Sequence, residues 1–248
     1  MSNNAEYDSQ AVDYDESRFT DPLGHHLDYM HKRIIIQFIN PTTKLVLEAG
    51  VGTGRFATWL AKKGVEVVGI DLSKEMLKKS KAKKALLNVD VPLVMADVHN
   101  LPFKQGIFDA CICINVMDHF PDVTAFLQQV NYVINHDDGY FVFNFSNVYS
   151  PYLPVALAIN SNKHAMFKSG KIQSHWFTLR EVDDMLAKSG FVITNVKGCF
   201  IASPVPLGNI LIKLIQALNF STEDSRLKFF SGSPFIKAKT RTSVNYSR

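Results

Sequence analysis

A glycine-rich turn between an apolar run and a helix-like segment is the strongest constraint in this sequence. The stretch Leu45–Phe56 reads LVLEAGVGTGRF, so the apolar run ends in Glu48 and three glycines follow at alternate positions. A run of this kind is typical of a buried strand, and the glycines indicate a turn before a helix. Glycine accepts positive φ and has no Cβ, and the first N–H groups of a helix are unpaired. We therefore expect a nucleotide-like ligand to lie against this turn.

Strand-like and helix-like segments alternate along most of the chain. We expect strands at 44–49, 65–70, 91–95, 108–114, 140–145, 191–197 and 235–240, and helices at 23–39, 54–63, from Ser73, from Pro121 and at 178–190. Nearly continuous apolar strands that alternate with helices predict a parallel, doubly wound α/β sheet covered on both faces. With 248 residues, of which 46% are hydrophobic, the chain can bury one large core. We expect a single domain, in which 1–40 form an N-terminal lid and helix and 41–248 the main fold.

Two later segments depart from this alternation. Residues 146–177 form a long connection, and 207–220 carry an apolar stripe at helical spacing before the last strand. The stripe either packs as a plain helix or belongs to a substrate cap. We expect cap segments at about 146–177 and 200–233, and a greasy cap would favour a lipophilic substrate or contact with a membrane surface.

The glycine spacing separates classes of nucleotide-like ligand. A dinucleotide-binding turn requires a third glycine where this chain has Arg55, and no Gly-Lys-Ser/Thr of a phosphate-binding loop follows. The pattern is instead an acidic residue followed by Gly-x-Gly-x-Gly.

Acidic residues mark the ends of three successive predicted strands. They are Glu48, Asp71 and Asp97, and the carboxyl ends of parallel strands form one crevice in an open sheet. Asp71 lies about twenty residues beyond the turn, where a carboxylate can accept from two ribose hydroxyls. As an alternative, Asp71 is an acid at a helix N-terminus, although Ser73 can already cap that helix.

Together these motifs resemble the class I S-adenosylmethionine-dependent methyltransferases. The resemblance covers roughly residues 40–200 and extends to methyltransferase type 11 and quinone-biosynthesis C-methyltransferase relatives. It rests on EAGVGTG from Glu48, VGIDLS from Val68, ADV from Ala96 followed by LPF, and the stretch from Phe108-Asp109 to His119. It implies a Rossmann-like, mostly parallel seven-stranded sheet with an antiparallel last strand near 235–240. S-adenosyl-L-methionine would be the cofactor and S-adenosyl-L-homocysteine the product.

The resemblance also implies the cofactor contacts. Around the methionine part and the sulfonium these are Glu48, Gly50, Gly52, Gly54, Asn115, Val116 and Met117. Asp71 would bind the ribose, Asp97 the adenine amino group, and Leu72 and Val98 the adenine ring, with Met76 also in the cofactor site. In the stretch YDESRF, which resembles an N-terminal lid, Tyr14 and Arg18 would close over the cofactor.

The candidate catalytic residues are His119 and Asp118. A histidine of near-neutral pKa just beyond the fourth strand can take a proton from the acceptor, but a histidine at a helix start can also simply bind the backbone. Asp118 has the same two interpretations. Four other histidines could reach the substrate side, although each is also an ordinary surface or packing residue: His25, His26, His164 and His175.

Composition excludes several other classes. The net charge is +4, and the basic run Lys74–Lys84 is typical of a solvated helix face with a Glu75–Lys79 pair, so we expect no nucleic acid. The three cysteines lack metal-ligand spacing, so we predict no metal site and interpret them as reduced core thiols of a cytoplasmic protein. The polar, acidic start of the chain is the opposite of a signal peptide, and no apolar run is long enough to span a membrane.

The predicted activity is methyl transfer to a small, lipophilic molecule, with an oxygen, nitrogen or carbon acceptor. Asn115-Val116-Met117-Asp118 stands where base amino-methyltransferases carry Asn/Asp-Pro-Pro-Tyr. Peptide, protein and RNA substrates remain alternatives, as do a nicotinamide-dependent oxidoreductase and a non-catalytic cofactor-binding protein. The acceptor and the oligomeric state stay open.

Overall fold

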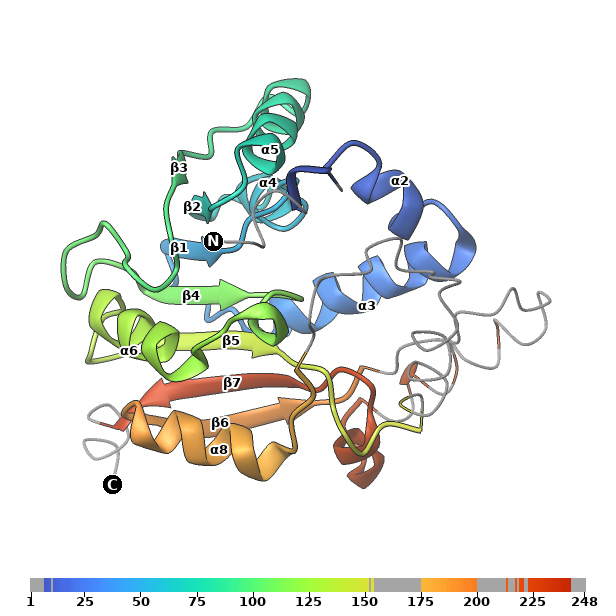
Figure 1. Ribbon diagram of the computed structural model, residues 1–248, viewed down its shortest axis with the longest axis vertical. Coiled ribbons are helices and arrows are strands. Elements are labelled where there is room, and N and C mark those ends of the chain that lie inside the picture. Colours follow the sequence, from blue (N-terminus) through green and yellow to red (C-terminus); the bar gives the residue numbers. More distant parts are fainter. Residues whose placement is uncertain are drawn as a thin grey trace.

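A seven-stranded sheet forms the centre of the molecule in the computed structural model (Figure 1). The structure describes residues 7–9, 11–151, 153, 175–199, 213, 217, 219–220 and 223–241. The strands are β1 (Leu45–Ala49), β2 (Glu66–Asp71), β3 (Leu93–Met95), β4 (Ala110–Cys113), β5 (Tyr140–Asn144), β6 (Phe191–Lys197) and β7 (Phe235–Thr240). Their order is β3-β2-β1-β4-β5-β7-β6, and β7 runs antiparallel to both neighbours. The predicted fold class and the antiparallel last strand are confirmed.

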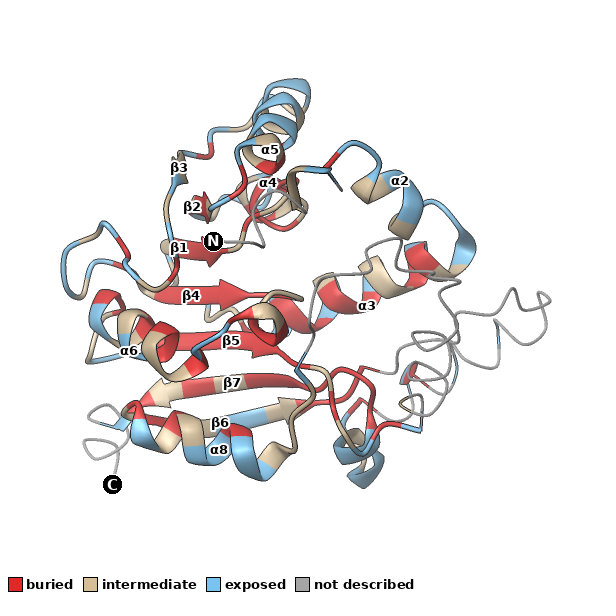
Figure 2. Cartoon of the chain, viewed as in Figure 1, coloured by how far each residue is buried: buried red, intermediate tan, exposed pale blue. Residues whose placement is uncertain are grey.

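Helices cover both faces of this sheet (Figures 1 and 2). One face carries α3 (Pro22–Phe38), α4 (Ala57–Ala61) and α5 (Lys74–Leu86), and the other carries α6 (Val123–Val133) and α8 (Leu179–Lys188). Side chains of a strand alternate between faces. In β4, Cys111 and Cys113 accordingly belong to the core under α6 and α8, and Ile112 to the core under α3. Both cysteines are buried and free, as predicted.

Capping side chains fix where the covering helices begin. The Ser73 hydroxyl accepts from the Met76 N–H at 3.1 Å and starts α5, and Asp122 accepts from the Ala125 N–H at 2.9 Å at the start of α6. Thr178 and Glu181 form the predicted capping box of α8. These contacts pair N–H groups that the first turn of a helix leaves free.

Boundaries near the glycine turn differ from the prediction. The sequence predicted a helix over 54–63, but α4 covers only Ala57–Ala61. Gly54 has φ of 78°, which is incompatible with a right-handed helix, so the helix begins only after Phe56. Strands β3 and β4 are likewise shorter than predicted.

The expected cap segments lie largely outside the described residues. Of 207–220, only residues 213, 217, 219 and 220 are described, and these are helical. The ends of the 146–177 connection meet in a parallel bridge between Asn147 and Phe177. A short 3₁₀ helix, η2 (Arg226–Phe230), precedes β7. Among the described residues, no helix combines the length and apolarity needed to cross a bilayer.

Candidate active site

A cavity of about 760 Å³ opens at the carboxyl ends of β1, β2, β3 and β4. This is the edge at which open α/β sheets bind ligands. Twelve of the cofactor and catalytic residues proposed from the sequence line it: Tyr14, Glu48, Gly50, Gly52, Asp71, Leu72, Met76, Asp97, Val98, Asn115, Val116 and His119. The chain therefore brings residues from four strand ends and the N-terminal segment into one enclosure.

The glycine turn shapes one wall of this cavity. Gly50, Gly52 and Gly54 have φ of 76°, 51° and 78°, a region that favours glycine. A Cβ on Gly50 would come within 2.7 Å of the Val116 side chain. A Cβ on Gly52 would meet no atom within 4 Å, so this residue faces open space in the cavity. The turn therefore packs closely against Val116 at Gly50. At Gly52 its surface is open to the cavity and can receive a ligand.

Asp71 links the end of β2 to the glycine turn. Its Oδ2 accepts from the Gly52 N–H and its Oδ1 from the Ser73 N–H, both at 2.8 Å. Burial raises the pKa of this carboxyl, and the backbone N–H groups of Ser73 and Gly52 oppose that rise. Each carboxylate oxygen has a further lone pair that can accept from a ligand. Asp71 therefore serves the helix start and lines the cavity at the same time.

Glu48 is a buried carboxyl group on the cavity wall. Only 2% of its surface is exposed, and its Oε2 has no hydrogen-bond partner. Burial raises its pKa to about 8, although Arg55 and the Ala57 N–H lower it. A buried polar atom without a partner is costly, so a ligand with a donor at this position would gain a favourable contact.

Asp97 follows β3 at the same edge and is held by His99. Its Oδ1 accepts from the His99 N–H at 2.9 Å and lies 2.8 Å from the His99 Nδ1. Partial burial raises the pKa of Asp97, but the hydrogen bonds and charge of His99 outweigh burial and lower the pKa. Asp97 therefore remains an ionised acceptor at neutral pH.

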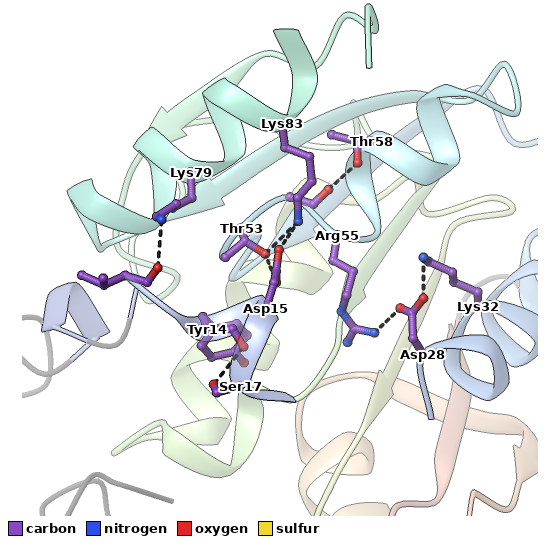
Figure 3. Close-up of polar contacts among 12 residues, drawn as sticks. Tyr14, Asp15, Ser17, Asp28, Lys32, Thr53, Arg55, Thr58, Lys79 and Lys83 are labelled. Atoms are coloured by element: carbon purple, nitrogen blue, oxygen red, sulfur yellow. Dashed lines mark hydrogen bonds and ion pairs between the residues drawn. The ribbon is translucent and has the colours of Figure 1, made fainter. Parts of the chain in front are cut away.

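An N-terminal strap, residues 7–9 and 11–20, closes one side of the cavity. It contributes Tyr7 and Tyr14 to the lining, and α2 (Tyr14–Phe19) lies within it. Figure 3 shows Asp15 between Thr53 and Lys83: its Oδ1 accepts from the Thr53 hydroxyl at 2.7 Å, and its Oδ2 pairs with the Lys83 Nζ.

Helix α5 holds the strap at two further points. The Lys79 Nζ donates to the Val12 carbonyl at 2.9 Å, and Asp8 accepts from the Ser73 hydroxyl at 2.5 Å. The predicted Glu75–Lys79 pair is wrong, because Glu75 pairs instead with Lys78 at 2.6 Å. The basic run is thus partly a docking face for the acidic strap rather than a solvated face alone.

Arg55 joins the glycine turn to the N-terminal helices. Its guanidinium lies 4.0 Å from the ring centroids of both Phe19 and Phe56, and its Nη1 is 2.6 Å from the Asp28 Oδ1 (Figure 3). Aromatic faces attract a cation at such distances. Arg55 stands where dinucleotide-binding turns carry their third glycine. Its contacts here are structural, because they fasten α2 and α3 to the cavity.

Four of the proposed residues are not part of the cavity lining: Arg18, Gly54, Met117 and Asp118. Arg18 donates to the Tyr14 hydroxyl at 3.2 Å, Gly54 packs against Ser80, and Met117 is fully buried in the core. Asp118 faces Ser146: its Oδ2 accepts from the Ser146 hydroxyl at 2.6 Å, and its carbonyl accepts from the His175 N–H at 2.8 Å. Burial raises the pKa of Asp118 to about 6, despite the hydrogen bonds from Ser146.

His119 lies on the cavity wall and contacts the strap. It ends the 3₁₀ turn η1 (Met117–His119), and its ring packs edge to face against Tyr7 with centroids 5.9 Å apart. His175 lines the same part of the cavity. Of the other candidate histidines, His26 is buried 3.0 Å from Asn219, His25 is exposed on α3, and His164 lies outside the described residues.

Sequence reasoning missed Tyr7 and His99 as lining residues. Tyr7 is one of the aromatic residues spaced among the acids of the first twenty positions, which was a weak signal. His99 stands two residues after Asp97, close enough to support that carboxylate, but no pattern singled it out. Within the ranges the structure describes, no group of three or more His, Cys, Asp or Glu could hold a metal ion.

Comparison with known proteins identifies a methyltransferase domain in part of the chain. Residues 47–143 match the family model described as a methyltransferase domain. An uncharacterised protein of Methanocaldococcus jannaschii, MJ1252, is 29% identical over 219 residues, which cover 79% of this chain and 83% of that protein. A ubiquinone biosynthesis O-methyltransferase of Xanthomonas axonopodis is 30% identical over 105 residues, 42% of this chain and 44% of the relative. The chain thus matches less than half the length of that enzyme.

Solved structures share the fold over nearly the whole chain. The magnesium protoporphyrin IX methyltransferase of Synechocystis with bound S-adenosylhomocysteine has a TM-score of 0.66 at 17% identity and covers 95% of this chain and 97% of its own. The PH0226 protein of Pyrococcus horikoshii has a TM-score of 0.68 at 18% identity over 94% of this chain and 98% of its own. The open face at Gly52 and the unpaired Glu48 oxygen suit S-adenosylmethionine as cofactor. The chain thus contains a methyltransferase domain and has the fold of S-adenosylmethionine-dependent methyltransferases.

Proposed function

We propose that this enzyme transfers the methyl group to a hydroxyl oxygen of a small, lipophilic molecule. The observation that carries the proposal is the set of side chains on the part of the cavity wall that lies outside the proposed cofactor contacts. Among the described residues, that part of the wall includes Tyr7, Ile114, His119, Phe120, Pro121 and His175, none of which carries a carboxylate. Apolar and aromatic walls with a few polar groups are typical of sites for small molecules.

The proposed cofactor contacts follow the strand ends. Asp71 accepts from the ribose hydroxyls, Asp97 accepts from the adenine amino group, and Leu72, Met76 and Val98 contact the adenine. The Glu48 Oε2, buried and unpaired, accepts from the ammonium of the methionine part, beside the open face of Gly52. Tyr14 closes the cavity from the strap. We place Arg18, Gly54 and Met117 in supporting positions, since none lines the cavity.

Positioning supplies most of the proposed rate acceleration. When bound, S-adenosylmethionine offers an electrophilic methyl group on its sulfonium, and transfer leaves S-adenosylhomocysteine. A cavity that holds the acceptor oxygen in line can contribute roughly 7–11 kcal/mol to lowering the barrier. His119 accepts the hydroxyl proton as the oxygen bonds to carbon, which adds about a hundredfold or more. Asp118 acts as a positioning residue, because it faces Ser146 and not the cavity.

Relatives support an oxygen acceptor on a lipophilic molecule. The Xanthomonas enzyme that matches part of this chain is named a ubiquinone biosynthesis O-methyltransferase. An imidazole in the cavity also suits an acceptor that must lose a proton.

A labelling experiment tests the acceptor class. The protein is incubated with methyl-labelled S-adenosylmethionine and a fractionated extract of its source organism. We expect label in the solvent-extractable small molecules, with a methyl group that resists mild alkali, as an ether does and an ester does not. Label that enters protein or RNA would contradict the proposal, as would an N-methyl or C-methyl product.

A further inference from the structure

A chain of buried hydrogen bonds supports the cavity wall from behind. Asn144, at the end of β5, is 2% exposed. Its Oδ1 accepts from the Asn115 N–H at 2.7 Å, and its Nδ2 donates to the Asn115 Oδ1 and to the Ser233 Oγ, both at 2.6 Å. Asn144 therefore uses both ends of its carboxamide, and two of its three contacts go to one cavity residue.

Asn115 needs this support because its backbone is strained. Its φ is 60°, one of two positive values among the described non-glycine residues. That conformation costs free energy in any residue with a Cβ and persists where surrounding contacts enforce it. Asn144 binds both the backbone N–H and the side chain of Asn115, so it fixes the direction in which the chain leaves β4.

The direction of the chain after β4 determines how the wall meets the glycine turn. Val116 follows Asn115, and both its γ carbons lie 2.7 Å from the place a Cβ on Gly50 would occupy. Asn115, Val116 and Gly50 all line the cavity. A change in the Asn115 backbone would therefore move Val116 relative to the turn that borders the cofactor.

We propose that Asn144 is a positioning residue for cofactor binding, which acts by holding Asn115 in its left-handed conformation. It touches neither the cavity nor the reacting atoms. Its effect passes through the Asn115 backbone to Val116 and the glycine turn. The inference rests on the proposed place of the cofactor in this cavity.

Asn147 provides a matched control three residues further along the chain. It is also a buried asparagine, 1% exposed, and its Nδ2 donates to the carbonyls of Phe229 and Ser231, both at 2.9 Å. These contacts hold the segment before β7 and do not reach the cavity lining. Replacement of Asn147 by Ala thus removes a similar set of buried hydrogen bonds, but these bonds lead to the segment before β7 and not to the cavity wall.

The test measures S-adenosylhomocysteine binding by calorimetry together with the melting temperature. Asn144→Ala should weaken binding by about tenfold or more, and Asn147→Ala should leave the Kd near that of the wild type at a comparable loss of melting temperature. Asn144→Ser keeps a polar group near the Asn115 N–H and should weaken binding less, so it serves if the alanine variant does not fold.

A second-site change separates positioning from general destabilisation. Glycine adopts positive φ without the penalty of a Cβ, so Asn144→Ala should weaken binding much less in the Asn115→Gly background than in the wild type, whatever Asn115→Gly itself costs. Equal weakening by Asn144→Ala and Asn147→Ala, wild-type affinity in Asn144→Ala, or an equal loss from Asn144→Ala in both backgrounds would each overturn the inference. If the wild type itself bound no S-adenosylhomocysteine, the proposed cofactor site would fail instead.

Discussion

The ammonium group of Lys83 pairs with the carboxylate of Asp15, so helix α5 holds the N-terminal strap against the glycine turn. The same Nζ lies 3.2 Å from the Thr53 hydroxyl, which also donates to Asp15. Thr53 belongs to the turn and lines the cavity. One ion pair therefore connects three parts of the chain that are distant in sequence: the strap, the turn and α5.

Removal of this ion pair should weaken cofactor binding modestly. Lys83 and Asp15 are partly exposed, at 25% and 36%, and such pairs contribute about 0.5–1 kcal/mol. Lys83→Ala should therefore raise the Kd for S-adenosylhomocysteine about two- to fivefold in low salt. Salt screens exposed charges, so the difference from the wild type should shrink at high ionic strength. The control is Lys81→Ala, which removes an exposed lysine of the same helix. An equal rise of the Kd in both variants would show that the contact between Lys83 and the strap is not the cause.

Loss of the Asp71 carboxylate should abolish measurable binding. Hydrogen bonds to a charged group contribute about 1.5–3 kcal/mol each, so loss of two predicts a Kd more than about a hundredfold higher. Asp71→Asn is the milder variant, because an amide retains one acceptor for the Gly52 or Ser73 N–H and preserves the turn. Circular dichroism and the melting temperature establish that the fold survives. Calorimetry that shows unchanged affinity would contradict the ribose assignment.

The carboxylates at the strand ends were predictable, whereas the orientation of the η1 turn was not. Apolar runs that end in Glu48, Asp71 and Asp97 define strand ends directly, and parallel strands must align those ends. Met117, Asp118 and His119 lie in a single 3₁₀ turn, where consecutive side chains point in different directions and no periodicity reports which faces the cavity. Only the structure shows that His119 lines the cavity while Met117 enters the core.

Contacts between segments that are distant along the chain could not be predicted from the sequence either. The acidic strap and the basic run of α5 were both visible, but complementary charge alone does not specify which lysine pairs with which aspartate. Lys79 binds a carbonyl of the strap and not Glu75, because tertiary contacts outweigh a weak local ion pair.

Glu48 should couple cofactor binding to proton release. Burial raises its pKa to about 8, so the carboxyl is mostly protonated at pH 7 without cofactor. An ammonium group placed beside it favours the ionised form, so binding at pH 7 should release a substantial fraction of one proton. Calorimetry of S-adenosylhomocysteine binding in buffers of different ionisation enthalpy measures that number, and Glu48→Gln should bring it close to zero. Equal proton release in both proteins would exclude Glu48 as the source.

The same carboxyl should make the cofactor-free protein less stable as the pH rises. The pKa of Glu48 is about 8 in the folded chain and 4.5 in the unfolded chain, so the folded state binds more protons between these values. The free energy of unfolding must then fall through this window, and the contribution is lost above about pH 8. Denaturant titrations from pH 5 to pH 9 should show a shallower fall in Glu48→Gln than in the wild type.

Substitutions of His119 and Asp118, which are adjacent in η1, should differ in their effect on turnover. His119→Ala should lower the rate of label transfer into the solvent-extractable fraction about a hundredfold or more without a change in affinity for S-adenosylhomocysteine. Asp118→Asn should lower the rate less, because a carboxamide can still accept from the Ser146 N–H. A larger loss in Asp118→Asn than in His119→Ala would reverse these roles.

Two glycines of the same turn should respond differently to the same added methyl group. Both have positive φ, so alanine adds backbone strain of about 1–2 kcal/mol at either position. A Cβ on Gly50 would also meet Val116 at 2.7 Å, so Gly50→Ala should lower the melting temperature further. Gly52 has open space, so Gly52→Ala should fold with a smaller loss. Its new methyl group projects into the volume that we assign to the cofactor, and calorimetry should show weaker S-adenosylhomocysteine binding in a protein that remains folded. Wild-type affinity in Gly52→Ala would mean that the cofactor does not approach this face of the turn.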